Sequence, residues 1–285
     1  MPSEPPELPK FGPPALPPPL VAEFTAKELA ELRRAKGLLE NPGLTARLAS
    51  MVGKPIEQGI KLLPAGWQKI VHKATRAALE KSLDVAISSL GKRPRATSSE
   101  RMHKVMVGAS GGVGGLFGLA SLPVELPLST ALMLRSIADI ARSEGHDLRR
   151  AEVQLGCLEV FALGGPSAAD DATESSYWAV RTAMAKAVSE AATYLGGRGV
   201  MDHSAPAVVR FIGAVASRFG VVVSEEVAAK AIPVIGAAGG AALNVLFIEH
   251  FQSMARGHFI VKRFELKYGR ERVRAVYESL AMRTG

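Results

Sequence analysis

A glycine-rich segment holds the serine best placed for nucleophilic chemistry. A G-x-S-x-G pattern starts at Gly108 and places Ser110 where an α/β hydrolase carries its nucleophile, on a turn between a strand and a helix. Asp139 and His250 follow in the order Ser, Asp, His and would complete a triad. In an α/β hydrolase this turn is held by a parallel sheet, and the alternating strands of such a sheet are not found elsewhere in the sequence. A hydrolase is therefore the alternative function, either with Ser110 or with a carboxylate and histidine site around Glu125 and His250.

A metal centre would draw on similar side chains. His250 and His258 are eight residues apart. Because eight residues rise about 12 Å along a helix, the two rings cannot share one ion on a continuous helix. Asp170, Asp171 and Glu174 are explained by the N-terminal cap of a helix. The sequence therefore predicts no metal site and no cofactor.

Charged residues inside apolar segments indicate a polar site more directly. Glu125 lies in SLPVELPLS, Arg135 in ALMLRSIAD, and Glu249 with His250 in LFIEHFQ. A buried charge needs a partner, and Arg135 can pair with Asp139 four residues later on a helix. We expect these five residues to form one internal network, which either fixes the helix register or binds a ligand headgroup. Arg135→Ala is expected to destabilise the fold strongly.

The elements that position these residues are predicted to be helices. The chain is 47% hydrophobic but only 6% aromatic, which favours close-packed helices over a sheet sandwich. Gly108 and Gly112 are four residues apart and share a helix face, so another backbone can approach closely. The segment from Pro233 to Ile248 repeats this glycine and alanine pattern. We expect an all-α, multi-helix bundle around two Gly-rich apolar hairpin segments that pack on each other.

Helix limits follow from capping and breaking residues. Trp67 opens an amphipathic helix that Gly91 ends. Another helix begins near Pro206 and is expected to stop at Gly220, and Ser224 is expected to cap the next one.

Three regions are predicted along the chain. Residues 1–24 are a disordered Pro-rich tail, because proline removes backbone donors. This tail is either a linker or a site for a protein partner. Residues 25–64 form an N-terminal helical extension, whose first helix opens with a capping box of Thr25 and Glu28. Residues 65–285 form the main helical domain.

The net charge of +8 indicates affinity for polyanions. The aromatic side chains that stack on bases are largely missing, so an anionic membrane surface is favoured over nucleic acid. Two basic groups are expected to face the membrane, although a solvated surface explains them equally well. They are Lys92, Arg93, Arg95, Arg101 and Lys104 in one group and Lys262 and Arg263 in the other.

The N-terminus and two apolar segments indicate where in the cell the protein is located. The N-terminus has no basic cluster before an apolar core, so we expect no secretory signal and a cytoplasmic protein at the inner membrane face. The stretches from Val105 to Val124 and from Ile232 to Ile248 carry no charge and approach the roughly 20 residues that span a bilayer. Pro123 and Asn244 interrupt them. A transmembrane hairpin, a buried hairpin and a reversible surface association all stay open.

Taken together, the segments resemble a known family. GASGGVGGLFGLASLPVELPLSTALMLRSIADIARSEGHDL, QLGCLEVFALGG and IPVIGAAGGAALNVLFIEHFQSMARGHFIVKRFELKYG occur in an order similar to the EcsC protein family, over approximately Trp67 to Tyr277. The resemblance implies a largely helical, cytoplasmic or membrane-peripheral protein without a settled activity, typified by a bacterial protein encoded beside an ABC transporter. We expect a non-enzymatic, membrane-associated protein that binds lipid or another apolar ligand and is accessory to membrane transport or secretion.

Overall fold

The structure is a computed structural model of the 285-residue chain, and it describes residues 23–40, 48, 56–90, 122–163, 165, 176–198, 205–231 and 236–280. Several predicted features lie outside these residues. They are most of the Pro-rich tail, the first Gly-rich segment with Ser110, the basic connector from Lys92 to Lys104, and the predicted cap at Asp170 and Asp171.

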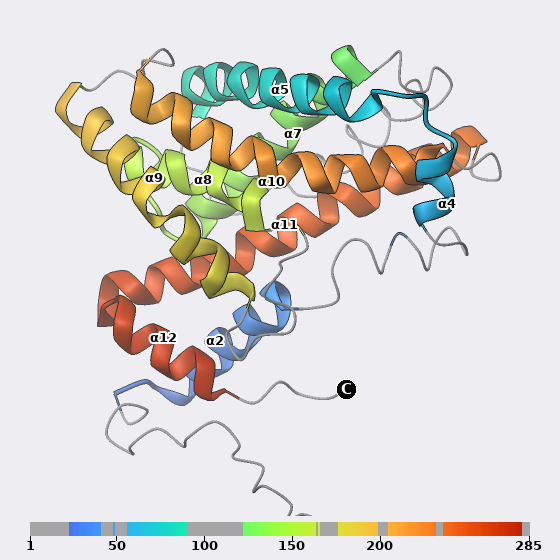
Figure 1. The fold of residues 1–285 in the computed structure, drawn as a ribbon. Helices are drawn as coiled ribbons and strands as arrows, with labels where there is room; N and C mark the ends of the chain where they lie inside the picture. Colours follow the sequence, from blue (N-terminus) through green and yellow to red (C-terminus); the bar gives the residue numbers. More distant parts are fainter. Residues whose placement is uncertain are drawn as a thin grey trace, which may run out of the picture.

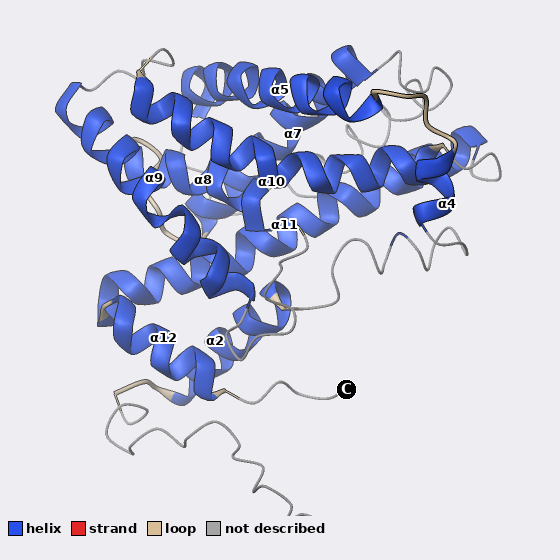
Figure 2. Cartoon of the chain, in the orientation of Figure 1, coloured by secondary structure: helices blue, strands red, loops and turns tan. Residues whose placement is uncertain are grey.

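Helices make up almost all of the described chain, and no strand occurs within it, which confirms the predicted all-α fold (Figure 2). The helices are α2 (Ala26–Leu39), α4 (Ile56–Lys61), α5 (Trp67–Leu90), α7 (Leu122–Ser143), α8 (Ala151–Leu163), α9 (Ser176–Arg198), α10 (Pro206–Lys230), α11 (Gly236–Tyr268) and α12 (Arg270–Ser279).

Helix α10 is central to the bundle, because it packs against α4, α5, α8, α9 and α11. Helix α5 also packs along α7. The 33 residues of α11 extend for about 50 Å, from the end of the bundle that carries α4 to the end that carries α12 (Figure 1). The rings of Phe161, Phe219 and Phe251 pack in tilted and edge-to-face contacts where α8, α10 and α11 meet, with ring centroids 4.7 to 5.5 Å apart.

The observed limits of helix α10 differ from the helix limits that the sequence predicts. The sequence predicts a stop at Gly220 and a cap at Ser224, but the helix runs without a break from Pro206 to Lys230. The hydroxyl of Ser224 donates to the backbone carbonyl of Gly220, 2.7 Å away. Serine therefore satisfies its hydroxyl within the helix, one turn back, and does not cap a new helix.

Helix α2 lies across the C-terminal half of α11 and also contacts α12 (Figure 1). The predicted capping box is confirmed, because Thr25 Oγ1 accepts from the Glu28 backbone and the Glu28 carboxylate accepts from the Thr25 backbone. Phe24, which the sequence assigns to the tail, is buried with its ring 4.1 Å from that of Tyr268. The folded region therefore includes Phe24.

Candidate functional site

Glu125 belongs to a buried ion cluster at the end of α10. Lys230 Nζ donates to Glu125 Oε1 over 3.0 Å and lies 2.9 Å from Glu226 Oε1. The side-chain amide of Asn244 also donates to Glu125 Oε1, over 3.3 Å. Asn244 belongs to the second Gly-rich segment, so the structure brings that segment to Glu125.

Two carboxylates share one ammonium group in this cluster. Burial raises the pKa of Glu226, and the charge of Glu125 raises it further, while Lys230 opposes both effects. Burial acts to lower the pKa of Lys230, but the carboxylates of Glu226 and Glu125 outweigh it and raise the value. Sequence reasoning missed Lys230 and Glu226, although their i,i+4 spacing in an apolar helix signals such a pair.

The other residues of the predicted network are placed differently. Arg135 is exposed, so it does not join an internal network. Asp139 is buried but pairs with Arg142 over 3.5 Å, three residues later on α7. Arg135 points to solvent because α7 buries its opposite face against the bundle. His250 is buried beside Phe251 and Glu249 is half-buried, both on α11.

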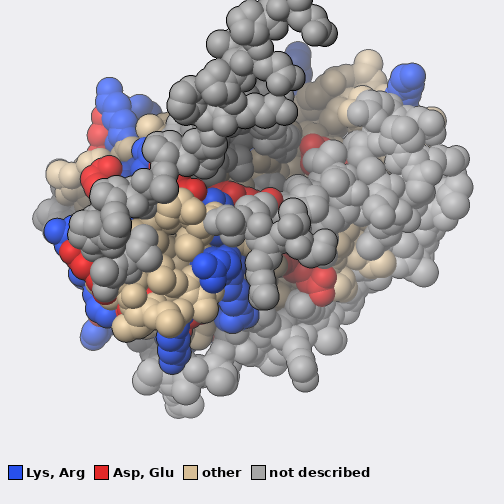
Figure 3. Space-filling model, turned by 90° about the horizontal axis from the view of Figure 1, so that it is seen from below, with Lys and Arg blue, Asp and Glu red and all other residues tan. Residues whose placement is uncertain are grey.

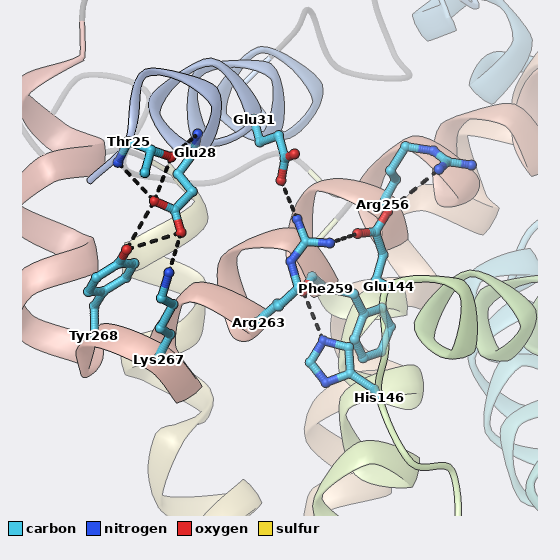
Figure 4. Close-up of polar contacts among 10 residues, drawn as sticks. All are labelled: Thr25, Glu28, Glu31, Glu144, His146, Arg256, Phe259, Arg263, Lys267 and Tyr268. Carbon is cyan, nitrogen blue, oxygen red and sulfur yellow. Dashed lines mark hydrogen bonds and ion pairs between the residues drawn. The ribbon is translucent and has the colours of Figure 1, made fainter. Parts of the chain in front are cut away.

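The basic residues predicted on α11 are held by carboxylates. Arg263 donates to Glu144 over 2.7 Å and to Glu31 over 2.5 Å, and it links α2, α11 and the end of α7 (Figure 4). Lys262 Nζ lies 3.6 Å from the buried Glu159. Carboxylates therefore offset the charges of Lys262 and Arg263, and their predicted place at a membrane surface stays a prediction.

A second set of polar contacts holds α2 (Figure 4). Glu28 accepts from Lys267 over 2.6 Å and from the Tyr268 hydroxyl over 3.0 Å. The bond from Lys267 is the main reason that the pKa of Glu28 is lowered to about 2. At the other end of α2, Lys36 Nζ donates to the carbonyls of Tyr277 and Leu280, over 3.1 and 2.8 Å, and so caps the C-terminus of α12.

His258 lies in a buried polar chain between α8, α9 and α11. Arg181 donates to the Tyr177 hydroxyl over 3.3 Å, and this hydroxyl lies 3.2 Å from His258 Nδ1. Because arginine only donates, the Tyr177 oxygen accepts from Arg181. On the other side of the ring, His258 Nε2 lies 3.6 Å from Glu159 Oε2. Arg181 is fixed in turn by two bonds to Glu265, of 2.6 and 3.0 Å.

The surroundings of His258 in this buried polar chain keep its imidazole neutral. Complete burial, and then the positive charges of Lys262 and Arg181, hold the pKa of His258 well below its usual value. The nearby Cys157 thiol is also inert, because burial raises its pKa to about 12. Neither group is a candidate catalyst in this state.

The candidate catalytic and metal-ligating residues can be compared with the structure only within the described helices. No group of three or more His, Cys, Asp or Glu side chains suited to a metal ion occurs among the described residues. The carboxylate of Asp139 is engaged by Arg142. Ser110 lies outside the described residues.

The surface of α4 and α5 combines basic and apolar side chains. Lys69, Lys73 and Lys81 are exposed on α5, and Glu80 is the only acidic residue between Trp67 and Ser82. Lys61 is exposed at the end of α4. Three large apolar side chains, Ile60, Leu62 and Ile70, are between 41 and 56% exposed beside these lysines.

Comparison with known families fits this all-helical arrangement. The sequence profile of the EcsC protein family matches residues 26–264. The chain belongs to the EcsC protein family. No curated protein and no solved structure matches the chain. The EcsC match begins at Ala26, so it includes α2, whereas the resemblance in the sequence extends over approximately Trp67 to Tyr277.

The EcsC region of this chain contains one long apolar helix among its described helices. Helix α10 is long and apolar enough to cross a membrane by length and composition, but half of its most apolar window is buried in the bundle. A core helix passes the same test, and α10 packs on five other helices.

Proposed function

We propose that this EcsC-family protein is a non-enzymatic peripheral membrane protein, which binds an anionic lipid surface from the cytoplasmic side. The observation that carries the proposal is the surface of α4 and α5, where exposed lysines lie beside exposed apolar side chains. Proteins that bind membranes reversibly combine these two features.

Other basic residues are less suitable, because acidic side chains compensate them. On α11 and α12, Arg263, Lys267, Arg272 and Arg274 all pair with carboxylates. In the view from below, basic and acidic side chains are interspersed over the described part of the surface (Figure 3). The α4 and α5 surface therefore has the better match to a negatively charged plane.

Charge alone provides weak association. A lysine near an anionic membrane contributes about 1 kcal/mol, so Lys61, Lys69, Lys73 and Lys81 together correspond to a Kd of about 1 mM. Stable binding needs a second, apolar contribution. The exposed Ile60, Leu62 and Ile70 are suited to supply it.

Co-sedimentation with vesicles tests the proposal. We expect the protein to pellet with phosphatidylglycerol vesicles at low salt, to pellet poorly with phosphatidylcholine vesicles, and to be released by high salt. The variant Lys69→Glu with Lys73→Glu should lower the bound fraction at least tenfold. Lys186→Glu with Arg270→Glu makes the same charge change on exposed residues of α9 and α12 and should have a much smaller effect. Equal losses in both variants, or no binding to either lipid, would refute the proposed surface.

The proposal also includes a bound lipid or other apolar ligand near the Gly-rich segments, with a role accessory to membrane transport or secretion. Native mass spectrometry of protein purified without delipidation tests the ligand. A lipid mass adduct that survives gel filtration is expected, and protein at its bare mass would contradict it. The Pro-rich tail is proposed as the site for a protein partner.

A further inference from the structure

The first turns of helix α7 expose apolar side chains and bury polar ones. Val124 and Leu128 are 76 and 52% exposed, while the side chain of Glu125 is only 13% exposed. Ser129 and Thr130 are buried as well. A helix that meets water presents its polar residues outward, so this turn of α7 is suited to an apolar surrounding.

The ion cluster of Glu125 and Lys230 allows the first turns of α7 to bury an acidic side chain. Glu125 turns inward to Lys230 and Asn244, so its charge is compensated on the protein side. The first turns of α7 can then present apolar atoms outward without an unpaired acid among them. Exposed apolar patches of this kind mark interaction surfaces.

Among the described residues, five of the seven exposed large apolar side chains lie on or directly after α4, in the first turn of α5 or in the first turns of α7. Gly59 of α4 lies so close to Ala228 that a Cβ there would be 1.9 Å from the Ala228 carbonyl oxygen, so α4 abuts the same last turns of α10 as Glu125. Val221 and Leu266 lie elsewhere on α10 and α11. The five are Ile60 on α4, Leu62 directly after it, Ile70 in the first turn of α5, and Val124 and Leu128 in the first turns of α7.

We infer that this end of the bundle, with Val124 and Leu128 leading, enters the hydrocarbon region of an anionic bilayer while Lys61, Lys69 and Lys73 remain at the headgroups. The inference rests on the proposed function and adds the surface and its orientation. In the sequence, the residues that lead directly into α7 (105–121) and those at the start of α11 (236–243) carry no charge. The bilayer is therefore favoured over a polar protein partner.

The length of α7 fits this orientation. Val124 and Arg135 are eleven residues apart, which is about 16 Å along a helix. Half the hydrocarbon core of a bilayer is about 15 Å. Because this distance is as large as half the hydrocarbon core, an insertion limited to the first turns of α7 leaves the exposed Arg135 outside the hydrocarbon, on the headgroup side with the lysines.

Site-directed labelling tests the inference. The only native cysteine, Cys157, is buried and poorly reactive, so a thiol dye labels an introduced cysteine selectively. We would label Val124→Cys with an environment-sensitive fluorophore and use Leu266→Cys as the matched control, because Leu266 is 73% exposed at the other end of α11. With phosphatidylglycerol vesicles, the emission of the label at position 124 should rise at least threefold and be quenched by lipids brominated in the acyl chain. The label at position 266 should change less than 1.5-fold.

The outcomes separate the two proposals. Vesicle binding by sedimentation without quenching at position 124 would overturn the inference and leave surface binding intact. Absence of any vesicle binding would overturn both. An emission rise at position 124 that depends on protein concentration without lipid would show that a second copy of the chain covers this surface, and it would overturn the inference. Val124→Glu should lower vesicle binding at least tenfold, and Leu266→Glu less than twofold.

Discussion

Gly257 lies where α2 crosses α11, so close to Leu39 that a Cβ at this position would be 2.6 Å from Leu39 Cγ and 3.0 Å from the carbonyl oxygen of Ala35. Glycine is therefore required for this crossing. The same pair of helices is joined by Glu28 with Lys267 and by Glu31 with Arg263. The N-terminal helix is part of the packed fold and not an appendage.

Gly257→Ala should displace α2. Overpacking of this kind costs about 1–3 kcal/mol, and we expect chemical denaturation to show that loss and limited proteolysis to cleave before α5 more rapidly. Gly213 is the matched control, because nothing lies within 4 Å of a Cβ there. Gly213→Ala should stabilise α10 by up to about 1 kcal/mol. A neutral Gly257→Ala would contradict the close crossing.

Glu28 should make the docking of α2 sensitive to acid. Its pKa is lowered in the folded protein from 4.5 to about 2, so its stabilising effect is fully present above pH 4.5 and is lost as the pH falls toward 2. Glu28→Gln should destabilise the protein at pH 7, and the difference from the unmodified chain should vanish near pH 2. Urea titrations at several pH values measure this. A difference that does not change with pH would show that Glu28 acts only through packing.

Arg142, and not Arg135, should matter for stability. Arg135 is exposed, so Arg135→Ala should change the free energy of unfolding by less than about 0.5 kcal/mol. Arg142→Ala removes the 3.5 Å ion pair to the buried Asp139 and should cost about 1–3 kcal/mol. Thermal unfolding of both variants measures the difference. A larger loss of stability in Arg135→Ala than in Arg142→Ala would instead support the internal network that the sequence predicts around Arg135.

Tyr177→Phe should break the buried chain at His258. The substitution removes the hydrogen-bond partner of His258 Nδ1 and the acceptor for Arg181, and an unsatisfied buried group costs about 1–3 kcal/mol. Tyr268→Phe serves as control, because it removes only a bond at the half-buried Glu28 and should cost about 0.5–1.5 kcal/mol. Equal effects would show that the chain through Tyr177 adds nothing.

The helical fold follows from local signals in the sequence. The capping box at Thr25 and the amphipathic pattern from Trp67 predict elements that the structure contains. The predicted helix end at Gly220 is wrong, because the sequence alone does not distinguish a glycine that ends a helix from one that lies inside a buried helix.

The polar contacts were less predictable, because they join residues far apart in the sequence. Glu125 was expected to have a buried partner, but Lys230 lies 105 residues away, and only the packing of α7 and α10 against their shared neighbours α5, α8 and α11 brings it near. Arg135 illustrates the opposite case. Its apolar neighbours in sequence suggested burial, whereas the side of α7 that it occupies faces outward.

Hydrogen exchange with and without phosphatidylglycerol vesicles tests whether the end of the bundle that carries α4 enters the bilayer. We expect vesicles to slow exchange in α4, in the first turns of α5 and in the first turns of α7, and to leave α12 unchanged. Protection confined to α2, α11 and α12, or no protection anywhere in the presence of saturating vesicles, would contradict it.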